Sequence, residues 1–255
     1  MKRLQDKVAV VTGAASGLGK AIAELYANEG AKVVAADISE AGLTAVADEI
    51  KRSGGTIKTV VADMAKAADI ENMIAMAVKE YGTIDILVNN AGIMDDFSPA
   101  GTVKDEMWAK VMEINLTGPF KAMRSALSIM LAKGSGIIIN IASIGGLQGA
   151  RAGAAYTASK HALIGLTKNT GYLYAKSGIR CNAIAPGAME TNIAATIDLK
   201  NLHPLVNERI MPGMVLNPRS SKPVEVAEVA LFLASEASGF VNGAVITADG
   251  GWTAY

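Results

Sequence analysis

The sequence predicts an α/β protein in which seven parallel strands form one sheet with helices on both faces. Seven short apolar runs alternate with helix-like segments almost to the C-terminal end, the pattern of repeated β–α units. No Pro/Ser-rich linker or low-complexity tract interrupts this alternation, so we expect residues 1–255 to form a single domain with a doubly wound, Rossmann-like sheet. The apolar runs are Val8–Val11, Val33–Ala36, Ile57–Val61, Ile84–Val88, Ile137–Ile141, Ile179–Ile184 and Ala244–Thr247.

The composition narrows the function classes. Lys plus Arg and Asp plus Glu both total 24, so no basic surplus indicates a nucleic-acid partner. No apolar run approaches the roughly 20 residues that span a bilayer, and the first residues lack the apolar core of a signal peptide. We therefore expect a cytoplasmic protein without membrane contact. The single cysteine, Cys181, lies in an apolar run and is expected in the core, and no metal site is predicted.

A glycine pattern follows the first strand. Gly13, Gly17 and Gly19 are spaced G-x-x-x-G-x-G and open a helix expected from about Leu18 to Asn28. Glycines at this place let the main chain approach a pyrophosphate at the helix N-terminus, although glycines also simply end strands. The strand before and the helix after favour a dinucleotide site.

The second strand ends in Asp37, followed by Ile38. A carboxylate here accepts both ribose hydroxyls and repels a 2′-phosphate, and Ala14–Ser16 offers no cation to hold that phosphate. This predicts NAD rather than NADP. The alternative is an aspartate that caps the next helix, for which Ser39 is an equal candidate.

Polar residues also follow later strands. Asp63 ends the third, and Asn89-Asn90-Ala91-Gly92 ends the fourth, where Asn89 is either a structural tie or a cofactor contact. Asn115 is expected inside a long helix, where a buried amide needs a polar partner.

Ser143 stands just past the fifth apolar run, and Tyr156 and Lys160 are four residues apart in an Ala-rich segment. The i, i+4 spacing places the phenol and the ammonium on one helix face. A nearby cation favours the phenolate, so the three side chains together indicate proton transfer to or from an alcohol or carbonyl.

These motifs, with Pro186-Gly187, occur in the order and spacing that resemble the short-chain dehydrogenase/reductase family over nearly the whole chain. The resemblance implies Tyr156 as general acid/base and Ser143 as the residue that orients the substrate oxygen. It also implies that Lys160 binds the nicotinamide ribose and that Asn115 holds a water of a proton relay. Asp63 would meet the adenine, and Asn89 and Gly92 the adenosine ribose.

The resemblance further implies NAD as cofactor and a homotetramer. The expected cofactor-binding residues follow successive strands, together with Tyr156 and Lys160 on the helix: Gly13, Ser16, Gly17, Leu18, Gly19, Asp37, Ile38, Asp63, Met64, Asn90, Ala91, Gly92, Tyr156, Lys160, Pro186, Gly187, Met189 and Thr191.

The alternation of apolar runs and helix-like segments is interrupted after Thr191. The segment Asn192–Lys222 combines prolines with apolar anchors such as Leu199, which predicts a mobile substrate lid at about 190–222. His203 in this segment and His161 are assigned no role. The C-terminal aromatics Trp252 and Tyr255 are expected to be buried against another subunit.

The function expected is an NAD-dependent oxidoreductase for a small, neutral, apolar or cyclic secondary alcohol or its ketone. The alternatives are a sugar or polyol dehydrogenase, a 3-oxoacyl-[acyl-carrier-protein] reductase and a non-catalytic dinucleotide-binding regulator. Against the carrier-protein enzyme, Ile129 and Tyr172 stand where that subgroup has arginines for its acidic partner. Against the regulator, Ser143, Tyr156 and Lys160 are all present.

Overall fold

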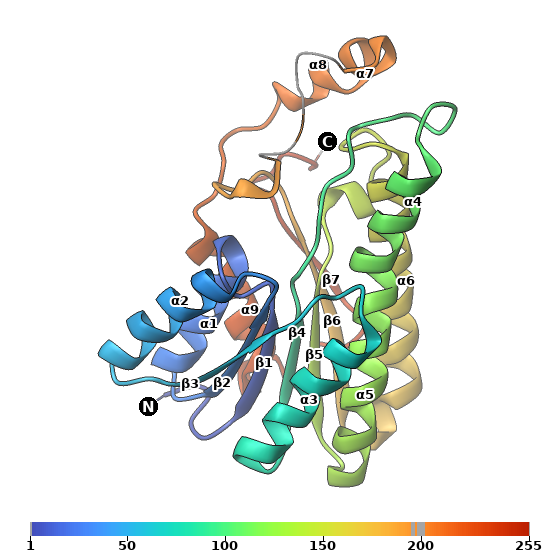
Figure 1. The fold of residues 1–255 in the computed structure, drawn as a ribbon. Coiled ribbons are helices and arrows are strands. Elements are labelled where there is room, and N and C mark those ends of the chain that lie inside the picture. Colours follow the sequence, from blue (N-terminus) through green and yellow to red (C-terminus); the bar gives the residue numbers. More distant parts are fainter. Residues whose placement is uncertain (1, 195–196, 198–201, 255) are drawn as a thin grey trace.

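Seven parallel strands form one sheet in the order β3-β2-β1-β4-β5-β6-β7 in the computed structural model, which describes residues 2–194, 197 and 202–254 (Figure 1). The predicted fold class is confirmed, and each predicted strand is present to within two residues at either end. The strands are β1 (Val8–Thr12), β2 (Lys32–Asp37), β3 (Thr56–Val61), β4 (Ile86–Asn89), β5 (Gly136–Ile141), β6 (Ile179–Pro186) and β7 (Val245–Ala248).

Helices cover both faces of the sheet because successive side chains of its buried strands point to opposite sides. Ala9 and Val11 of β1 pack with α1, α2 and α9, whereas Val8 and Val10 pack with α3 and α5 (Figure 1). Cys181 is buried in the second of these layers, as expected. The helices are α1 (Gly17–Asn28), α2 (Glu40–Arg52), α3 (Ala67–Tyr81), α4 (Asp105–Met112), α5 (Gly118–Lys133), α6 (Ala154–Tyr174), α7 (Pro204–Arg209), α8 (Met211–Met214) and α9 (Pro223–Ala234).

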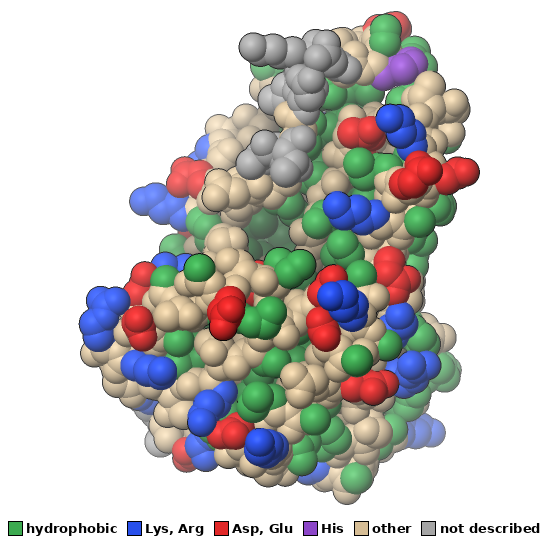
Figure 2. Space-filling view, in the orientation of Figure 1, with side chains coloured by type: hydrophobic (Ala, Val, Ile, Leu, Met, Phe, Trp, Pro, Cys, Tyr) green, Lys and Arg blue, Asp and Glu red, His purple; other side chains and the backbone are tan. Residues whose placement is uncertain are grey.

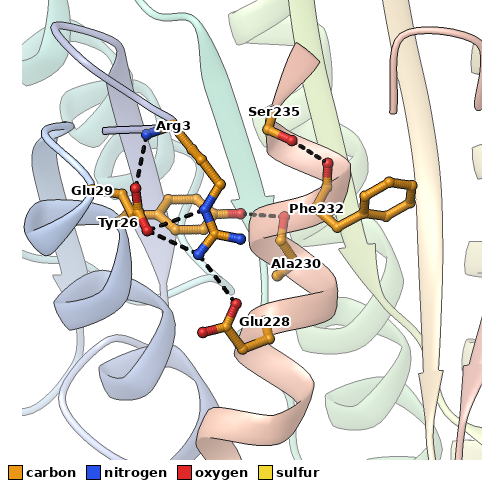
Figure 3. Close-up of polar contacts among 7 residues, drawn as sticks. All are labelled: Arg3, Tyr26, Glu29, Glu228, Ala230, Phe232 and Ser235. Atoms are coloured by element: carbon orange, nitrogen blue, oxygen red, sulfur yellow. Dashed lines mark hydrogen bonds and ion pairs between the residues drawn. The ribbon is translucent and has the colours of Figure 1, made fainter. Parts of the chain in front are cut away.

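Polar contacts join α1 to α9, which lie side by side on the first face. The buried Tyr26 hydroxyl donates to the Ala230 carbonyl at 2.8 Å, and Arg3 binds Glu29 and Glu228 (Figure 3). The contacts fix α1, and with it the glycine-rich turn that precedes this helix.

The helix expected around Asn115 is interrupted. A π-helical turn, Glu113–Thr117, separates α4 from α5, so the long helix predicted here is two helices joined by a wider turn. Such turns place an extra residue in the helix and are frequent at functional sites. Here the turn contains Asn115, whose side chain binds the segment after β4.

The carboxyl ends of the strands meet at one edge, where β1 pairs with both β2 and β4. The chain therefore winds outward to β3 and then in the opposite direction from β4. In open α/β sheets the crevice at this reversal is the usual ligand site.

Above this edge lies the segment predicted as a lid, with α7 and α8 at its far end (Figure 1). Its two stems are joined by a bridge between Met189 and Ser221. Leu199, one of its expected apolar anchors, lies outside the described residues. In the described part of the chain no helix is long and apolar enough to cross a membrane.

Candidate active site

Ser143 and Tyr156 meet on either side of Gly145. The Ser143 Oγ accepts from the Gly145 N–H at 3.0 Å. A Cβ added to Gly145 would lie 3.4 Å from both the Ser143 Oγ and the Tyr156 Cε1, so the two side chains flank this residue. The predicted hydroxyl pair is therefore assembled by the 3₁₀ turn Ile144–Gly146 between β5 and α6.

Lys160 lies on the same face of α6 as Tyr156, as the i, i+4 spacing predicts. Its Nζ is 5.5 Å from the Tyr156 ring centroid and donates to the Ile141 carbonyl at 2.8 Å. The lysine is only 3% exposed. The carbonyl at the end of β5 thus fixes the ammonium beside the phenol.

Burial controls the protonation of both groups in the protein alone. It raises the pKa of Tyr156 to about 12, against the hydrogen bond of Ser143, which lowers it, while the charge of Asp95 raises it. Burial also lowers the pKa of Lys160 to about 8. The expected depression of the phenol pKa by Lys160 is therefore not a property of the protein alone.

Asn115 has the polar partners that its burial requires. Its side chain accepts from the Ile93 N–H and donates to the Ile93 carbonyl, both at 2.9 Å, and lies 3.3 Å from the Ser159 Oγ. A Cβ on Gly92 would lie 3.2 Å from the Asn115 Oδ1 and 3.5 Å from the Lys160 Nζ. The π-helical turn thus places Asn115 beside Gly92 and Lys160, as the proposed relay requires.

The glycine turn provides a cradle that side chains would fill. Gly13 and Gly17 have φ of +67° and +53°, and a Cβ on Gly19 would lie 2.0 Å from the Gly13 carbonyl oxygen. Ser16 is the N-cap of α1 but its side chain caps no N–H, and the first turn of α1 has no acidic residue. N–H groups at a helix N-terminus that no N-cap side chain binds, in a first turn without an acidic residue, fit a dinucleotide pyrophosphate. Leu18 is buried, which leaves only its main chain for this purpose.

Asp37 serves the turn directly. Its Oδ2 accepts from the Ala15 N–H at 3.0 Å and its Oδ1 from the Ser39 N–H at 2.9 Å, while Ser39, not Asp37, caps α2 through Gly42. Ile38 beside it is 70% exposed. The half-buried carboxylate is at the place expected for a ribose partner.

Asp63 and Met64 differ in which of their groups a cofactor could contact. The Asp63 Oδ1 accepts from the Ala65 N–H, and its other oxygen lies 3.9 Å from the Lys66 Nζ. The Met64 side chain is buried in the core, so only its main chain is available to a cofactor.

The two asparagines after β4 have separate roles. Asn89 is 2% exposed and donates to the Asn140 Oδ1 at 2.8 Å, and Asn140 donates to Thr167 on α6. Asn90 donates to the carbonyls of Thr12 and Gly13, and its own N–H binds the Thr12 Oγ1. Asn89 thus makes the structural tie that is one of its two expected roles, while Asn90 and Ala91 adjoin the glycine turn.

The segment after β6 reaches the same crevice. A Cβ on Gly17 would lie 3.2 Å from the Thr191 Cγ2, so Thr191 stands over the glycine turn. Gly187 packs against Asp249, where a Cβ would lie 2.8 Å from that residue's Cβ. Pro186, Gly187, Met189 and Thr191 thus extend from the end of β6 to the first stem of the lid.

Two charged residues near the site were missed. Asp95 is buried at 2% exposure, and its carboxylate accepts main-chain N–H groups at the start of α6. Arg151, also buried, donates to the Gly213 carbonyl at 3.1 Å and lies over the Trp252 ring. Both contacts join residues far apart in the chain, so no local signal in the sequence could have found them.

The expectation for Trp252 is wrong. This side chain is 4% exposed within its own chain because it stacks under Arg151 and donates from Nε1 to Gly213. Tyr255 lies outside the described residues. His203 caps α7 by accepting from the Leu205 N–H, and His161 is exposed on α6. No group of three His, Cys, Asp or Glu able to hold a metal occurs in the described part of the chain.

Known proteins are similar in sequence to this one over nearly the whole chain. The family model described as enoyl-(acyl carrier protein) reductase matches residues 13–253. The chain is 42% identical to 3beta-hydroxysteroid dehydrogenase 2 of Eggerthella lenta, covering 99% of this chain and 96% of the relative. It is 39% identical to the 3-oxoacyl-[acyl-carrier-protein] reductase of Thermotoga maritima, covering 98% of both chains.

A solved structure of similar fold contains a cofactor. It is a protein from Beutenbergia cavernae assigned as an NAD(P)-dependent gluconate 5-dehydrogenase, with NADP bound at low occupancy. The TM-score is 0.88 at 40% identity, covering 99% of this chain and 98% of the other.

The fold and these relatives define the protein as an oxidoreductase acting on CH–OH groups with a nicotinamide dinucleotide. The chain belongs to the short-chain dehydrogenase/reductase family.

Proposed function

We propose that the protein is an NAD-dependent oxidoreductase that interconverts a small, neutral, largely apolar or cyclic secondary alcohol and its ketone. The placement of Ser143 and Tyr156 on either side of Gly145, with Lys160 behind the phenol, carries this proposal. A nicotinamide cofactor, when bound, supplies the hydride acceptor or donor.

The side chains divide the work of proton transfer. In the oxidation direction the Tyr156 oxygen accepts the hydroxyl proton, and Ser143 orients the substrate oxygen. Lys160 stabilises the phenolate and binds ribose hydroxyls, and Asn115 completes a path for the proton. The fixed main-chain partners of Lys160 and Asn115 support these assignments.

The cofactor preference rests on Asp37. A 2′-phosphate beside its carboxylate would meet a like charge, and the exposed Ile38 offers no cation in compensation. We therefore infer NAD as the preferred cofactor, bound by the residues at the ends of β1, β2, β4 and β6.

The substrate class rests on the space near α6. A cavity of about 310 Å³ lies between the first turn of α6, the segment after β4 and α7 of the lid. Its lining is apolar, with Phe97, Ala152 and Val206 among its residues, and Arg209 is the one charged residue there. Neither Ser143 nor Tyr156 lines it, so it suits the part of a substrate away from the reacting carbon. An apolar ring fits such a space better than a sugar.

The surface also favours a small substrate over one carried by an acidic protein. Tyr172, at one of the two places where arginines would dock the carrier, is 84% exposed. On the face turned to the viewer, basic and acidic side chains are interspersed, and the surface is hollowed beneath the lid (Figure 2). No one-signed basic surface is visible on this face to steer a carrier protein.

Self-association is part of the proposal. Large apolar side chains remain exposed along α4, α5 and α6, an arrangement typical of contact with another copy of the chain. They are Trp108, Phe120, Leu131, Tyr172 and Leu173. We propose a homotetramer on this basis and on the family resemblance. The cytoplasmic location stays a prediction.

One competition assay tests the function. In the oxidation direction, kcat/KM is compared between a cyclic secondary alcohol and a sugar. In the reduction direction, it is compared between a cyclic ketone and a 3-oxoacyl thioester. Each substrate is assayed with both NAD and NADP cofactors. We expect the cyclic alcohol and the cyclic ketone, assayed with the NAD cofactors, to have kcat/KM values more than tenfold higher than the other combinations. A higher value for the thioester would replace the proposed substrate class, and equal values with both cofactors would refute the role of Asp37.

A further inference from the structure

A buried carboxylate stands behind the catalytic helix. Asp95, in the segment after β4, is 2% exposed. Among the described residues it has no ion-pair partner, and its oxygens instead accept three main-chain N–H groups. Its Oδ1 binds Phe97 at 3.1 Å and Gly153 at 3.0 Å, and its Oδ2 binds Tyr156 at 2.9 Å. A buried ionised group costs free energy unless it is satisfied in this way.

These bonds cap α6 from outside the helix. The N-cap of α6 is Gly153, which has no side chain to bind the free N–H groups of the first turn. Tyr156 is the third residue of the helix, the place whose N–H an N-cap side chain ordinarily binds. Asp95 takes that place from a segment 58 residues earlier in the chain. The carboxylate also complements the positive end of the helix dipole.

The surrounding main chain is shaped to admit this carboxylate. A Cβ on Gly153 would lie 2.6 Å from the Asp95 Oδ2 and 2.7 Å from the Phe97 Cα, so only glycine allows the approach. Phe97 is buried and has φ of +63°, a left-handed conformation that costs a bulky residue about 1–3 kcal/mol. Such strain persists only where neighbouring contacts hold the backbone in place, and the hydrogen bond from the Phe97 N–H to Asp95 is one of these contacts.

The same carboxylate acts on the phenol through its charge. Burial is the main cause of the raised pKa of Tyr156, but the negative charge of Asp95 also raises it. A negative charge disfavours the phenolate, whereas the nearby Lys160 ammonium favours it. Asp95 therefore opposes ionisation of the phenol from the N-terminal end of α6.

The other charged groups on the segments and elements packed against α6 are directed elsewhere. Glu113 pairs with Lys121, Arg180 donates to carbonyls near the end of α9, and Arg151 binds Gly213. Arg209 of α7 is exposed and lines the cavity beside the first turn of α6, and the other titratable groups described nearby are exposed, among them Asp96, Lys104, Asp105, Glu106, Lys110, His161 and Lys168.

We propose that Asp95 is a positioning residue of the active site, which fixes the first turn of α6 through its main chain and places a negative charge at the helix turn that carries Tyr156. This inference rests on the proposed function, in which Tyr156 transfers the proton. Two consequences follow. The cap fixes the position of Tyr156 relative to Ser143, and the charge keeps the phenol protonated to higher pH than it would be without Asp95.

The test compares three variants. Asp95→Asn keeps an accepting oxygen for Phe97 and Gly153 but loses the charge and the bond to Tyr156. Asp95→Ala loses all three bonds. Asp96→Asn is the matched control, because the neighbouring carboxylate is exposed and binds only the Ser98 N–H in its own loop.

The charge is read from the phenol itself. The Tyr156 proton is titrated by NMR of isotopically labelled tyrosine, with Tyr156→Phe to assign the signal, so no substrate is needed. We expect Asp95→Asn to lower the phenol pKa by about one unit, because a like charge is removed, and Asp96→Asn to leave it unchanged. Identical titrations in the parent and Asp95→Asn would overturn the role of the charge.

The position is read from exchange and kinetics of the holoenzyme. We expect faster hydrogen exchange at the Tyr156 amide in both Asp95 variants. Their kcat should fall by about tenfold to a hundredfold at unchanged cofactor affinity, since small misplacements of reacting groups are costly. Parent-like exchange and kcat in Asp95→Ala would refute the positioning role; if that variant does not fold, Asp95→Asn decides in its place. A parent enzyme inactive on every alcohol would refute the proposed function alone, because the titration and the exchange still report on Asp95.

Discussion

The floor of the active site and the lid above it are attached to the molecule in contrasting ways. Buried side-chain amides tie the floor together, from Asn89 on β4 through Asn140 on β5 to Thr167 on α6. In the described part of the lid, the main-chain carbonyl of Gly213 accepts from Arg151 and Trp252, and Val206 of α7 is buried. The active-site side chains are therefore preorganised by buried hydrogen bonds, whereas we predict that the cover over the substrate opens.

The largest expected effect comes from breaking the chemistry of the floor without disturbing its structure. Tyr156→Phe removes only a hydroxyl and should lower kcat by about 10²–10⁴-fold, with cofactor affinity nearly unchanged. Steady-state kinetics and cofactor titration check this, with the exposed Tyr172→Phe as control. A variant that retained a tenth of the parent kcat would show that another group transfers the proton.

A second prediction concerns the charge buried in the floor. Because burial lowers the pKa of Lys160 to about 8, the folded protein binds fewer protons than the unfolded chain from about pH 8 to about pH 10. The free energy of unfolding should therefore gain up to about 3 kcal/mol as the pH rises through this window. Above it, the raised pKa of Tyr156 should reverse the trend.

Lys160→Met should remove that gain, and the exposed Lys168→Met on the same helix should retain it. Urea unfolding across the pH range measures the difference. Parallel stability curves for the parent and Lys160→Met would show that the ammonium is not desolvated in the folded protein.

The smallest effect is expected at the lid. Arg151→Ala should raise KM by about tenfold or less, because the hydrogen bond to Gly213 and the stacking on Trp252 are lost, and should lower kcat far less than the floor variants do. Arg124→Ala, which removes another arginine stacked on an aromatic ring, is the control. If Arg151→Ala instead lowered kcat as much as a floor variant, the contrast between the two regions would fail.

A feature of the fold or the site could be predicted from the sequence where the residues that determine it are close together in the chain. The strands and the glycine turn follow from apolar runs and their punctuation, and the spacing of Tyr156 and Lys160 is itself the geometry of one helix turn. The π-helical turn at Asn115 has no such signature, because one added residue leaves the apolar pattern nearly intact. Asp95 and Arg151 acquire their meaning only from partners about 60 residues away in the chain.

The wrong prediction for Trp252 has the same cause, a partner that is distant in the sequence. An aromatic residue near a chain end suggests an exposed surface, but the sequence gives no sign that Arg151 stacks over it. The prediction failed because it considered only neighbouring residues.

The stacking of Arg151 on Trp252 gives the protein an optical reporter of its own. The chain has two tryptophans, and the other, Trp108, is 41% exposed on α4. The Trp252 indole lies 4.6 Å from the guanidinium and is hydrogen-bonded to Gly213, so its fluorescence depends on whether α8 is seated. With Trp108 replaced by phenylalanine, the remaining tryptophan emission comes from Trp252 alone. The opening rate of the lid then becomes visible in a stopped-flow trace without any attached dye.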